Sequence, residues 1–230
     1  PVGDAPCIEN GFVTFGSFNR LNKINREVIA LWSGVLRAVP GSRLQMAGMP
    51  ANGAPEELLQ WFAAEGIAED RLIFYPRSGF SEYLKLHNQV DFCLDTFPYT
   101  GGTTTLHALW MGVPTLTIGG HAYPSYQGAL MLHQVGLEDY FVANNKEDFI
   151  IKALFLVKNQ IFLQDARFKL RNYLVDGYSA SLKAVVDSFS LAFQMTWQGW
   201  CEGEKPRSIR IDNSDINFDP CFVNYSDVIQ

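Results

Sequence analysis

The sequence predicts an α/β fold in which a parallel sheet is covered by helices on both faces. Short apolar runs bounded by turn residues alternate along the chain with segments of helical period. These runs are apolar at consecutive positions, as expected for strands that are buried on both faces of a parallel sheet. With 230 residues, 47% hydrophobic and 18% charged, the chain is long enough to bury such a core.

The first half of the chain supplies five strands and the helices between them. Asn25 is a suitable N-cap for the first of these helices, and the pair Pro40 and Gly41 ends it. The predicted strands are 12–18, 43–47, 71–75, 90–95 and 113–118, and the predicted helices are 26–39, 54–66, 81–89 and 103–111.

The second half is mostly helical and is expected to cover the sheet. The predicted helices are 125–135, 146–158, 160–176 and 179–200, with a short apolar segment at 140–142. We interpret 1–10 as a linker, 11–203 as one Rossmann-like lobe, and 204–230, rich in Asn, Asp and Ser, as an extended or disordered tail.

Charge and composition exclude several classes of partner. A net charge of −6 argues against a nucleic-acid surface, and no apolar run is long enough to span a bilayer. The four cysteines are far apart, with no spacing suited to zinc, so we expect no metal and a reducing, cytoplasmic location. The chain begins without Met and without a signal peptide, and we expect it to be part of a longer protein.

The stretch 90–105, VDFCLDTFPYTGGTTT, carries the strongest sign of function. Gly101 and Gly102 allow the backbone to approach a ligand closely, and the three threonines that follow open a helix. Unpaired amides and the positive dipole end of a helix favour an anion such as a phosphate. The same residues would also suit an ordinary turn followed by an N-cap.

Other polar loops follow the predicted strands at the same end. Residues 16–23 follow the first strand, 76–79 the third, and 119–121 the fifth. Because ligands bind beyond the carboxyl ends of strands in open parallel sheets, we expect these loops to converge on one site.

Several motifs, in order, carry a family resemblance. They are FGSFNRLNKI, RLIFYP and DFCLDTFPYTGGTTTLHALWMGVPTLT. Residues 11–203 resemble the carboxyl-terminal catalytic lobe of O-linked N-acetylglucosamine transferases, especially the bacterial and plant SPINDLY-like members. The resemblance implies a GT-B architecture of two Rossmann-like lobes preceded by tetratricopeptide repeats. It also implies a nucleotide-sugar donor, UDP-GlcNAc, used without a metal to glycosylate Ser or Thr of a protein acceptor that the repeats and the other lobe would hold.

The resemblance assigns roles to four polar residues. Lys23 matches the catalytic lysine that contacts the donor diphosphate and assists departure of the nucleotide. Arg20 matches a neighbouring polar position that faces the nucleotide, and Thr103 and Thr104 match the threonines that meet the phosphates. In the alternative interpretation, Arg20 and Lys23 are solvated loop charges.

Tyr83 matches a ring that stacks on the nucleobase, and other positions depart from the family pattern. His107 replaces a carboxylate that accepts hydrogen bonds from the ribose, and Gly102 replaces a residue that is histidine in some members. Phe80 and Tyr126 stand where positively charged residues are frequent. Tyr83 and His107 could instead be packing residues.

These departures leave three readings of the function open. The first is a donor-binding lobe that uses UDP-GlcNAc or, as in some SPINDLY-like relatives, GDP-fucose. The second is a degenerate, non-catalytic nucleotide-binding or interaction lobe. The third is another GT-B enzyme, such as a sugar-nucleotide epimerase, because a fold alone does not fix a function.

Overall fold

The computed structural model describes residues 2–203, which belong to two compact units. The first unit covers residues 1–172 and holds the whole sheet, and the second begins at Tyr173. The tail predicted at 204–230, with Cys221, lies outside the described residues. No helix in the part of the chain that the structure describes is long and apolar enough to cross a membrane.

The first unit contains a six-stranded sheet in which every neighbouring pair is parallel, as predicted. The strand order is β3-β2-β1-β4-β5-β6, so the direction of winding reverses between β1 and β4. The strands are β1 (Thr14–Ser17), β2 (Arg43–Met49), β3 (Leu72–Pro76), β4 (Phe92–Leu94), β5 (Thr115–Ile118) and β6 (Val142–Ala143). This order places the loops after β1 and β4 side by side, at the reversal point where doubly wound sheets bind ligands.

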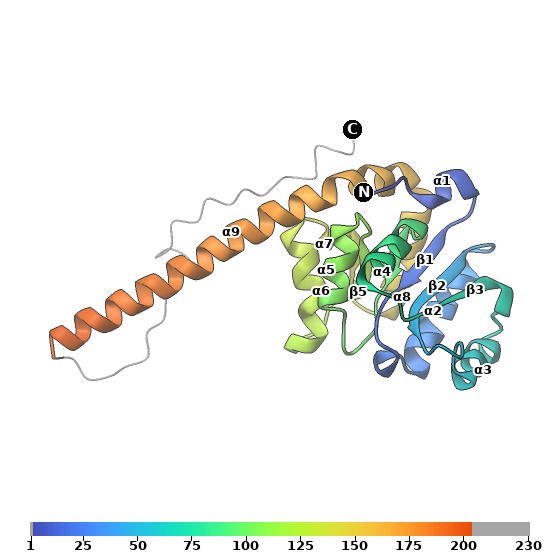
Figure 1. Cartoon of the computed structure of the whole chain (residues 1–230), viewed down its shortest axis with the longest axis horizontal. Helices are drawn as coiled ribbons and strands as arrows, with labels where there is room; N and C mark the ends of the chain where they lie inside the picture. The colour runs from blue at the N-terminus through green and yellow to red at the C-terminus, as the bar shows by residue number, and fades with distance from the viewer. Residues whose placement is uncertain (1, 204–230) are drawn as a thin grey trace. The chain divides into compact units, whose positions relative to one another are not determined.

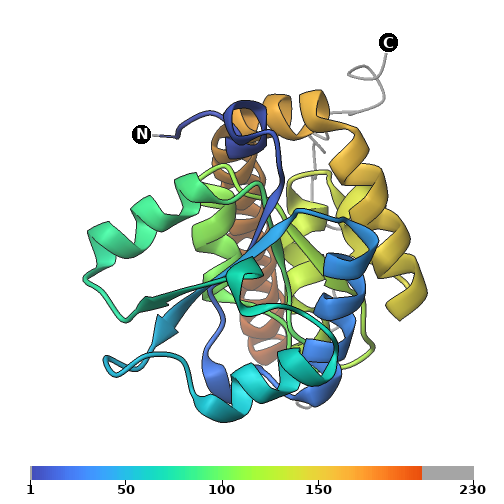
Figure 2. The ribbon, with the colours of Figure 1, turned by 90° about the vertical axis from the view of Figure 1, so that its right-hand side faces the viewer.

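Helices cover both faces of the sheet (Figures 1 and 2). On one face, α2 packs against α3 and α8. On the other face lie α4 and α5. Strand β5 is contacted by both α5 and α6. The helices are α1 (Pro6–Asn10), α2 (Arg26–Ala38), α3 (Glu56–Ala64), α4 (Phe80–Leu86), α5 (Thr103–Trp110), α6 (Tyr123–Gln134), α7 (Glu138–Phe141), α8 (Lys146–Lys158) and α9 (Gln160–Cys201). Three short 3-10 turns, η1 (Leu21–Lys23), η2 (Glu69–Arg71) and η3 (His87–Gln89), complete the connections.

Two helix starts follow directly from the sequence. The side chain of Asn25 accepts a hydrogen bond from the Val28 amide at 3.0 Å, and that of Asn145 accepts one from the Asp148 amide at 2.8 Å. Each Asn satisfies a donor that the first helical turn leaves unpaired. As a result, α2 and α8 begin at the predicted residues.

Two predicted elements are wrong in detail. The break expected between 176 and 179 is absent, because α9 runs continuously from 160 to 201. A single glycine inside a helix costs only about 1 kcal/mol relative to alanine, so Gly177 does not end it. The apolar segment at 140–142 is divided between α7 and a sixth strand, β6, which extends the sheet beside β5.

The segment predicted as a linker, 1–10, contains α1 and packs into the first unit. Ala5 and Cys7 are buried, and the Asp91 carboxylate accepts hydrogen bonds from the amides of Cys7 at 2.9 Å and Thr14 at 2.8 Å. Burial, reinforced by the charge of Asp91, raises the pKa of Cys7 to about 12, so its thiol stays protonated. One carboxylate therefore ties α1 to the start of β1.

Arg167, near the start of α9, is buried and links three distant segments. Its guanidinium donates hydrogen bonds to the carbonyl oxygens of Gly3 at 2.7 Å, Val90 at 2.8 Å and His87 at 3.1 Å. Burial lowers the pKa of Arg167, and the nearby charge of Asp91 opposes this effect. Arg167 thus joins the amino-terminal segment and the entry to β4 to the first turns of α9.

We expect Arg167→Met to lower the free energy of unfolding by about 3 kcal/mol, because three carbonyls lose a charged donor. Arg171→Met, one turn later on α9, is the matched control. Its guanidinium donates to a single backbone carbonyl, that of Trp110, so we expect a loss of about 1 kcal/mol or less. Urea unfolding of the two variants measures the difference, and equal losses would contradict a linking role for Arg167.

Candidate functional site

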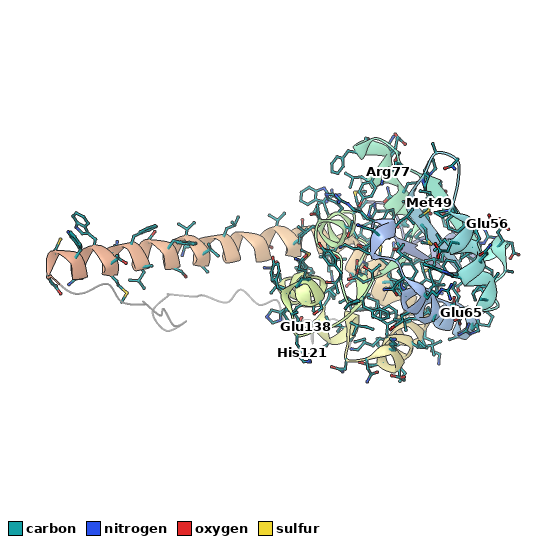
Figure 3. The ribbon with its side chains drawn as sticks, turned by 90° about the horizontal axis from the view of Figure 1, so that it is seen from below. Met49, Glu56, Glu65, Arg77, His121 and Glu138 are labelled. Carbon is teal, nitrogen blue, oxygen red and sulfur yellow. The ribbon has the colours of Figure 1, made fainter. Side chains whose placement is uncertain are left out.

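The candidate site lies at the carboxyl edge of the sheet, where the loops after β1 and β4 meet. Figure 3 looks onto this edge, with Met49 and Arg77 at the ends of β2 and β3 and His121 after β5. The polar loops that were predicted to follow the strands therefore lie at this one edge of the sheet.

A buried carboxylate, that of Asp95, stands at the centre of this edge. Its Oδ1 accepts hydrogen bonds from Asn19 Nδ2 at 3.0 Å and from the amides of Thr96 and Gly101, both at 2.8 Å. Its Oδ2 accepts one from Thr117 Oγ1 at 2.8 Å. Asp95 thereby connects the loop after β1, the loop after β4 and strand β5.

Asp95 is also held through its backbone. The indole N–H of the buried Trp32 in α2 donates to the Asp95 carbonyl oxygen at 3.0 Å. Burial raises the pKa of the Asp95 carboxyl, and the four donors oppose this effect. Because the donors come from both backbone and side chains, the conformation of the loop and the charge of Asp95 depend on each other.

The start of α5 is fixed by the same network. Thr104 Oγ1 donates to Asn19 Oδ1 at 3.0 Å, and the Leu106 amide donates to the Gly102 carbonyl at 3.1 Å. The amides of the preceding turn have no acceptor within the helix. A Cβ at Gly101 would lie 2.4 Å from Thr105 Oγ1, so any larger residue would force the Thr105 side chain or the loop to move.

Lys23 reaches this loop from η1. Its Nζ donates to the Thr100 carbonyl at 2.7 Å and lies 3.8 Å from the centre of the Tyr99 ring. Burial lowers the pKa of Lys23, the negative charge of Asp95 opposes this, and Arg20 lowers the pKa further. The ammonium group of Lys23 is thus held in place beside the glycine loop.

The structure brings Lys23, Gly101 and Thr104 together at the glycine loop. The other residues predicted to contact the phosphates, which are Gly102, Thr103 and Arg20, lie at the edge of this group. Gly102 is the N-cap of α5, and Thr103, its first residue, is exposed. Arg20 is the exposed N-cap of η1. Their predicted contacts with a nucleotide stay predictions.

Tyr83 and His107 are in contact with each other across α4 and α5. The Tyr83 hydroxyl lies 3.3 Å from His107 Nδ1, and the Tyr83 ring packs edge-on against Phe18 at 5.6 Å. The exposed Phe80 ring lies 5.2 Å from the His107 ring and 6.2 Å from that of Tyr83. Burial raises the pKa of Tyr83 and lowers that of His107, so both are neutral near pH 7.

The sequence did not single out Asn19 or Asp95 as site residues, although both lie within the motifs that carry the family resemblance. A carboxylate directly after an apolar strand, followed by a glycine loop, was the available signal. The sequence also carried no sign of the importance of Gly128 in α6. A Cβ at this position would lie 2.8 Å from Asp95 Oδ2, so the glycine allows α6 to approach the carboxylate. His121, which follows Gly120, is exposed, and its role stays open.

No group of three or more His, Cys, Asp or Glu side chains in residues 2–203 is arranged to hold a metal ion. The expectation that the reaction needs no metal stays a prediction.

Comparison with known proteins identifies the family. Residues 7–184 match the model of glycosyl transferase family 41. The chain belongs to glycosyltransferase family 41. A relative from Solanum lycopersicum, described as a probable UDP-N-acetylglucosamine–peptide N-acetylglucosaminyltransferase SPINDLY, is 33% identical over 92% of this chain and 23% of its own length. Its counterpart from Oryza sativa subsp. japonica is 33% identical over 97% of this chain and 24% of its own length.

Solved structures agree with the family and with the fold. A Thermobaculum terrenum O-GlcNAc transferase mutant matches with a TM-score of 0.71 and 31% identity, over 84% of this chain and 37% of the other. The carboxyl-terminal domain of a group 1 glycosyl transferase from Francisella tularensis has a TM-score of 0.51 at 15% identity, over 73% of this chain and 85% of that domain, and shows the fold alone. The predicted GT-B lobe is confirmed, and the family 41 chain spans about a quarter of the length of its curated relatives.

His87 supports this edge of the lobe from behind Tyr83. Its ring stacks on Phe18 with centroids 3.7 Å apart, and its Nδ1 lies 3.1 Å from the Tyr83 carbonyl oxygen. Its Nε2 is buried and has no hydrogen-bond partner among residues 2–203. Burial lowers the pKa of His87 to about 4, so the folded lobe holds it neutral.

We expect His87 to weaken the fold in mild acid. The unfolded chain binds a proton near pH 6.5 and the folded chain only near pH 4, so stability falls as the pH decreases through that window, by about 3 kcal/mol. Urea unfolding from pH 7 to pH 4 should show this loss in the wild type and not in His87→Phe. His121→Phe, which alters an exposed histidine, should keep the wild-type pH dependence, and an unchanged slope in His87→Phe would contradict the account.

Proposed function

We propose that this chain is the nucleotide-sugar-binding lobe of a protein O-glycosyltransferase that transfers N-acetylglucosamine from UDP-GlcNAc to Ser or Thr of protein acceptors. The observation that carries the proposal is the position of Lys23, whose ammonium group lies on the glycine loop that opens α5. Membership of family 41 and the similarity to relatives described as N-acetylglucosaminyltransferases that act on peptides support the donor and the acceptor. The acceptor would be held by segments that lie outside this chain.

The proposed reaction is a direct displacement at the anomeric carbon of the donor sugar. The acceptor hydroxyl oxygen forms the new bond and its proton passes to water or to an oxygen of the leaving diphosphate, while the bond from the anomeric carbon to the diphosphate oxygen breaks and its electron pair stays with the diphosphate. The diphosphate leaves with increased negative charge. Lys23 and the free amides at the start of α5 would stabilise this charge, because they are held in place before the reaction begins.

A second candidate function, nucleotide binding without turnover, is favoured by the ring cluster at Tyr83. The family carboxylate is replaced by His107, and the neighbouring position holds the apolar Phe80. A neutral imidazole accepts a hydrogen bond through one nitrogen only, so a ribose contact there would be weaker. The replacements at His107 and Phe80 would also affect whether the lobe prefers UDP-GlcNAc or GDP-fucose as its donor.

We also propose that the protein works in the cytoplasm, without a metal. Cys7 and Cys93 are unpaired and buried, as expected for a reducing compartment. The proposed chemistry depends on a fixed ammonium group and backbone amides, which take the place of a metal in neutralising the diphosphate.

We expect Lys23→Ala to weaken binding of UDP or GDP to this chain at least tenfold, because a charge-assisted contact to a phosphate contributes about 1.5–3 kcal/mol. Calorimetric titration with both nucleotides measures the effect and names the preferred base. Lys158→Ala, at the exposed end of α8, is the control and should bind as the wild type does.

Two outcomes would contradict the proposal. If the wild type binds neither nucleotide, the donor-lobe assignment fails. If Lys23→Ala binds as tightly as the wild type, the phosphates lie elsewhere. Binding without sugar transfer by the longer protein would favour the second candidate function.

A further inference from the structure

Gln127 in α6 occupies the space next to the first residues of α5. A Cβ built on Gly102 would lie 2.6 Å from Gln127 Oε1 and 3.7 Å from Gln127 Cδ. The side-chain amide of Gln127 therefore stands where a side chain at position 102 would otherwise point. Gly102 is the N-cap of α5, so this amide lies at the same end of the helix as its free backbone donors.

The start of α6 is tied to the glycine loop, which fixes the position of Gln127. The Thr100 amide donates to the Pro124 carbonyl at 3.0 Å, and the Gly128 amide donates to Thr100 Oγ1 at 3.2 Å. A Cβ at Gly128 would lie 2.8 Å from Asp95 Oδ2, so α6 approaches the loop as closely as a glycine permits. Gln127 is therefore held by backbone contacts on both sides, at residues 124 and 128.

The amide of Gln127 is available to a ligand. The residue is half-buried, and its side chain makes no hydrogen bond to any of residues 2–203 that the structure describes. A glutamine amide carries two N–H donors, and rotation of the terminal group presents either the oxygen or the nitrogen to a neighbour. Beside the positive end of α5, an anionic oxygen is the acceptor that this N–H group would meet.

We propose that Gln127 is a donor-binding residue that supplies a hydrogen bond from its Nε2 to a phosphate oxygen of the nucleoside diphosphate. It provides from α6 the donor that glycine at position 102 cannot provide from α5. This inference rests on the proposed function, because it names a further contact in the same nucleotide site. The competing explanation is that Gln127 only fills the space beside Gly102.

The test compares Gln127→Met with Gln127→Ala by calorimetric titration of UDP and GDP into this chain. Methionine fills a volume similar to that of glutamine but has no donor, so it separates hydrogen bonding from packing. We expect both variants to bind the preferred diphosphate about tenfold more weakly than the wild type, the size of one lost contact to a charged group. A space-filling role would leave Gln127→Met close to the wild type.

A reciprocal exchange supplies a positive control. Gly102→Ser alone should weaken binding, because its Cβ would displace the end of the Gln127 side chain from its position beside α5. Combining Gly102→Ser with Gln127→Ala leaves no side chain to displace and restores a donor from position 102. We expect the double variant to bind at least threefold more tightly than either single variant.

The outcomes separate this inference from the proposed function. If the wild type binds a diphosphate and Gln127→Met binds it equally well, Gln127 is a spacer and only this inference is overturned. If the wild type binds neither diphosphate, both proposals are overturned together. Thermal unfolding of each variant confirms that a loss of binding is not a loss of the fold.

Discussion

The carboxylate of Asp95 is the constraint on which the arrangement of this site depends. It lies at the end of β4, where the winding of the sheet reverses, and it accepts hydrogen bonds from segments that are far apart in the sequence. A buried carboxylate is costly unless all its acceptor positions are used. The loops that use them are consequently drawn together into one arrangement.

This arrangement explains how the site could act on a diphosphate with few charged residues of its own. Asn19 accepts from Thr104 while it donates to Asp95, so the loop after β1 is coupled to the start of α5. Lys23 lies on the same loop, and the negative charge of Asp95 opposes the loss of its proton on burial. An acidic chain with a net charge of −6 can thereby keep the local anion site that we propose. Because these groups are positioned by the fold, they need little reorganisation when charge develops on a leaving group.

Much of the fold could be predicted because its signals are local. Asn25 and Asn145 mark helix starts by capping a turn within three residues, and the consecutive apolar runs indicate buried parallel strands. The error at residues 1–10 came from tertiary contacts. Asp91 and Arg167 pack the segment predicted as a linker into the lobe through partners that are 77 or more residues away, and no local pattern carries that information.

In the candidate site too, some residues could be predicted from the sequence, whereas others are important only through tertiary contacts. The residue types and the family resemblance were enough to select Lys23, Gly101 and Thr104, which the structure brings together. They did not indicate Asn19, Asp95 or Gln127, because the importance of these residues lies in contacts between loops that only the strand order makes neighbours. From the sequence alone, glycine at position 102 indicates only the loss of a side-chain donor. In the structure, the Gln127 side chain occupies the space that a side chain at position 102 would fill.

The most direct test of this account is hydrogen exchange at the Gly101 amide in Asp95→Ala, measured together with the affinity of the folded variant for UDP and GDP. Because the Asp95 carboxylate is the acceptor for that amide, we predict that exchange at Gly101 becomes at least tenfold faster and that nucleotide binding is lost, while amides in α8 keep their protection. Unchanged protection at Gly101 with wild-type affinity would show that the loop is held by other contacts, and would contradict the central role of Asp95.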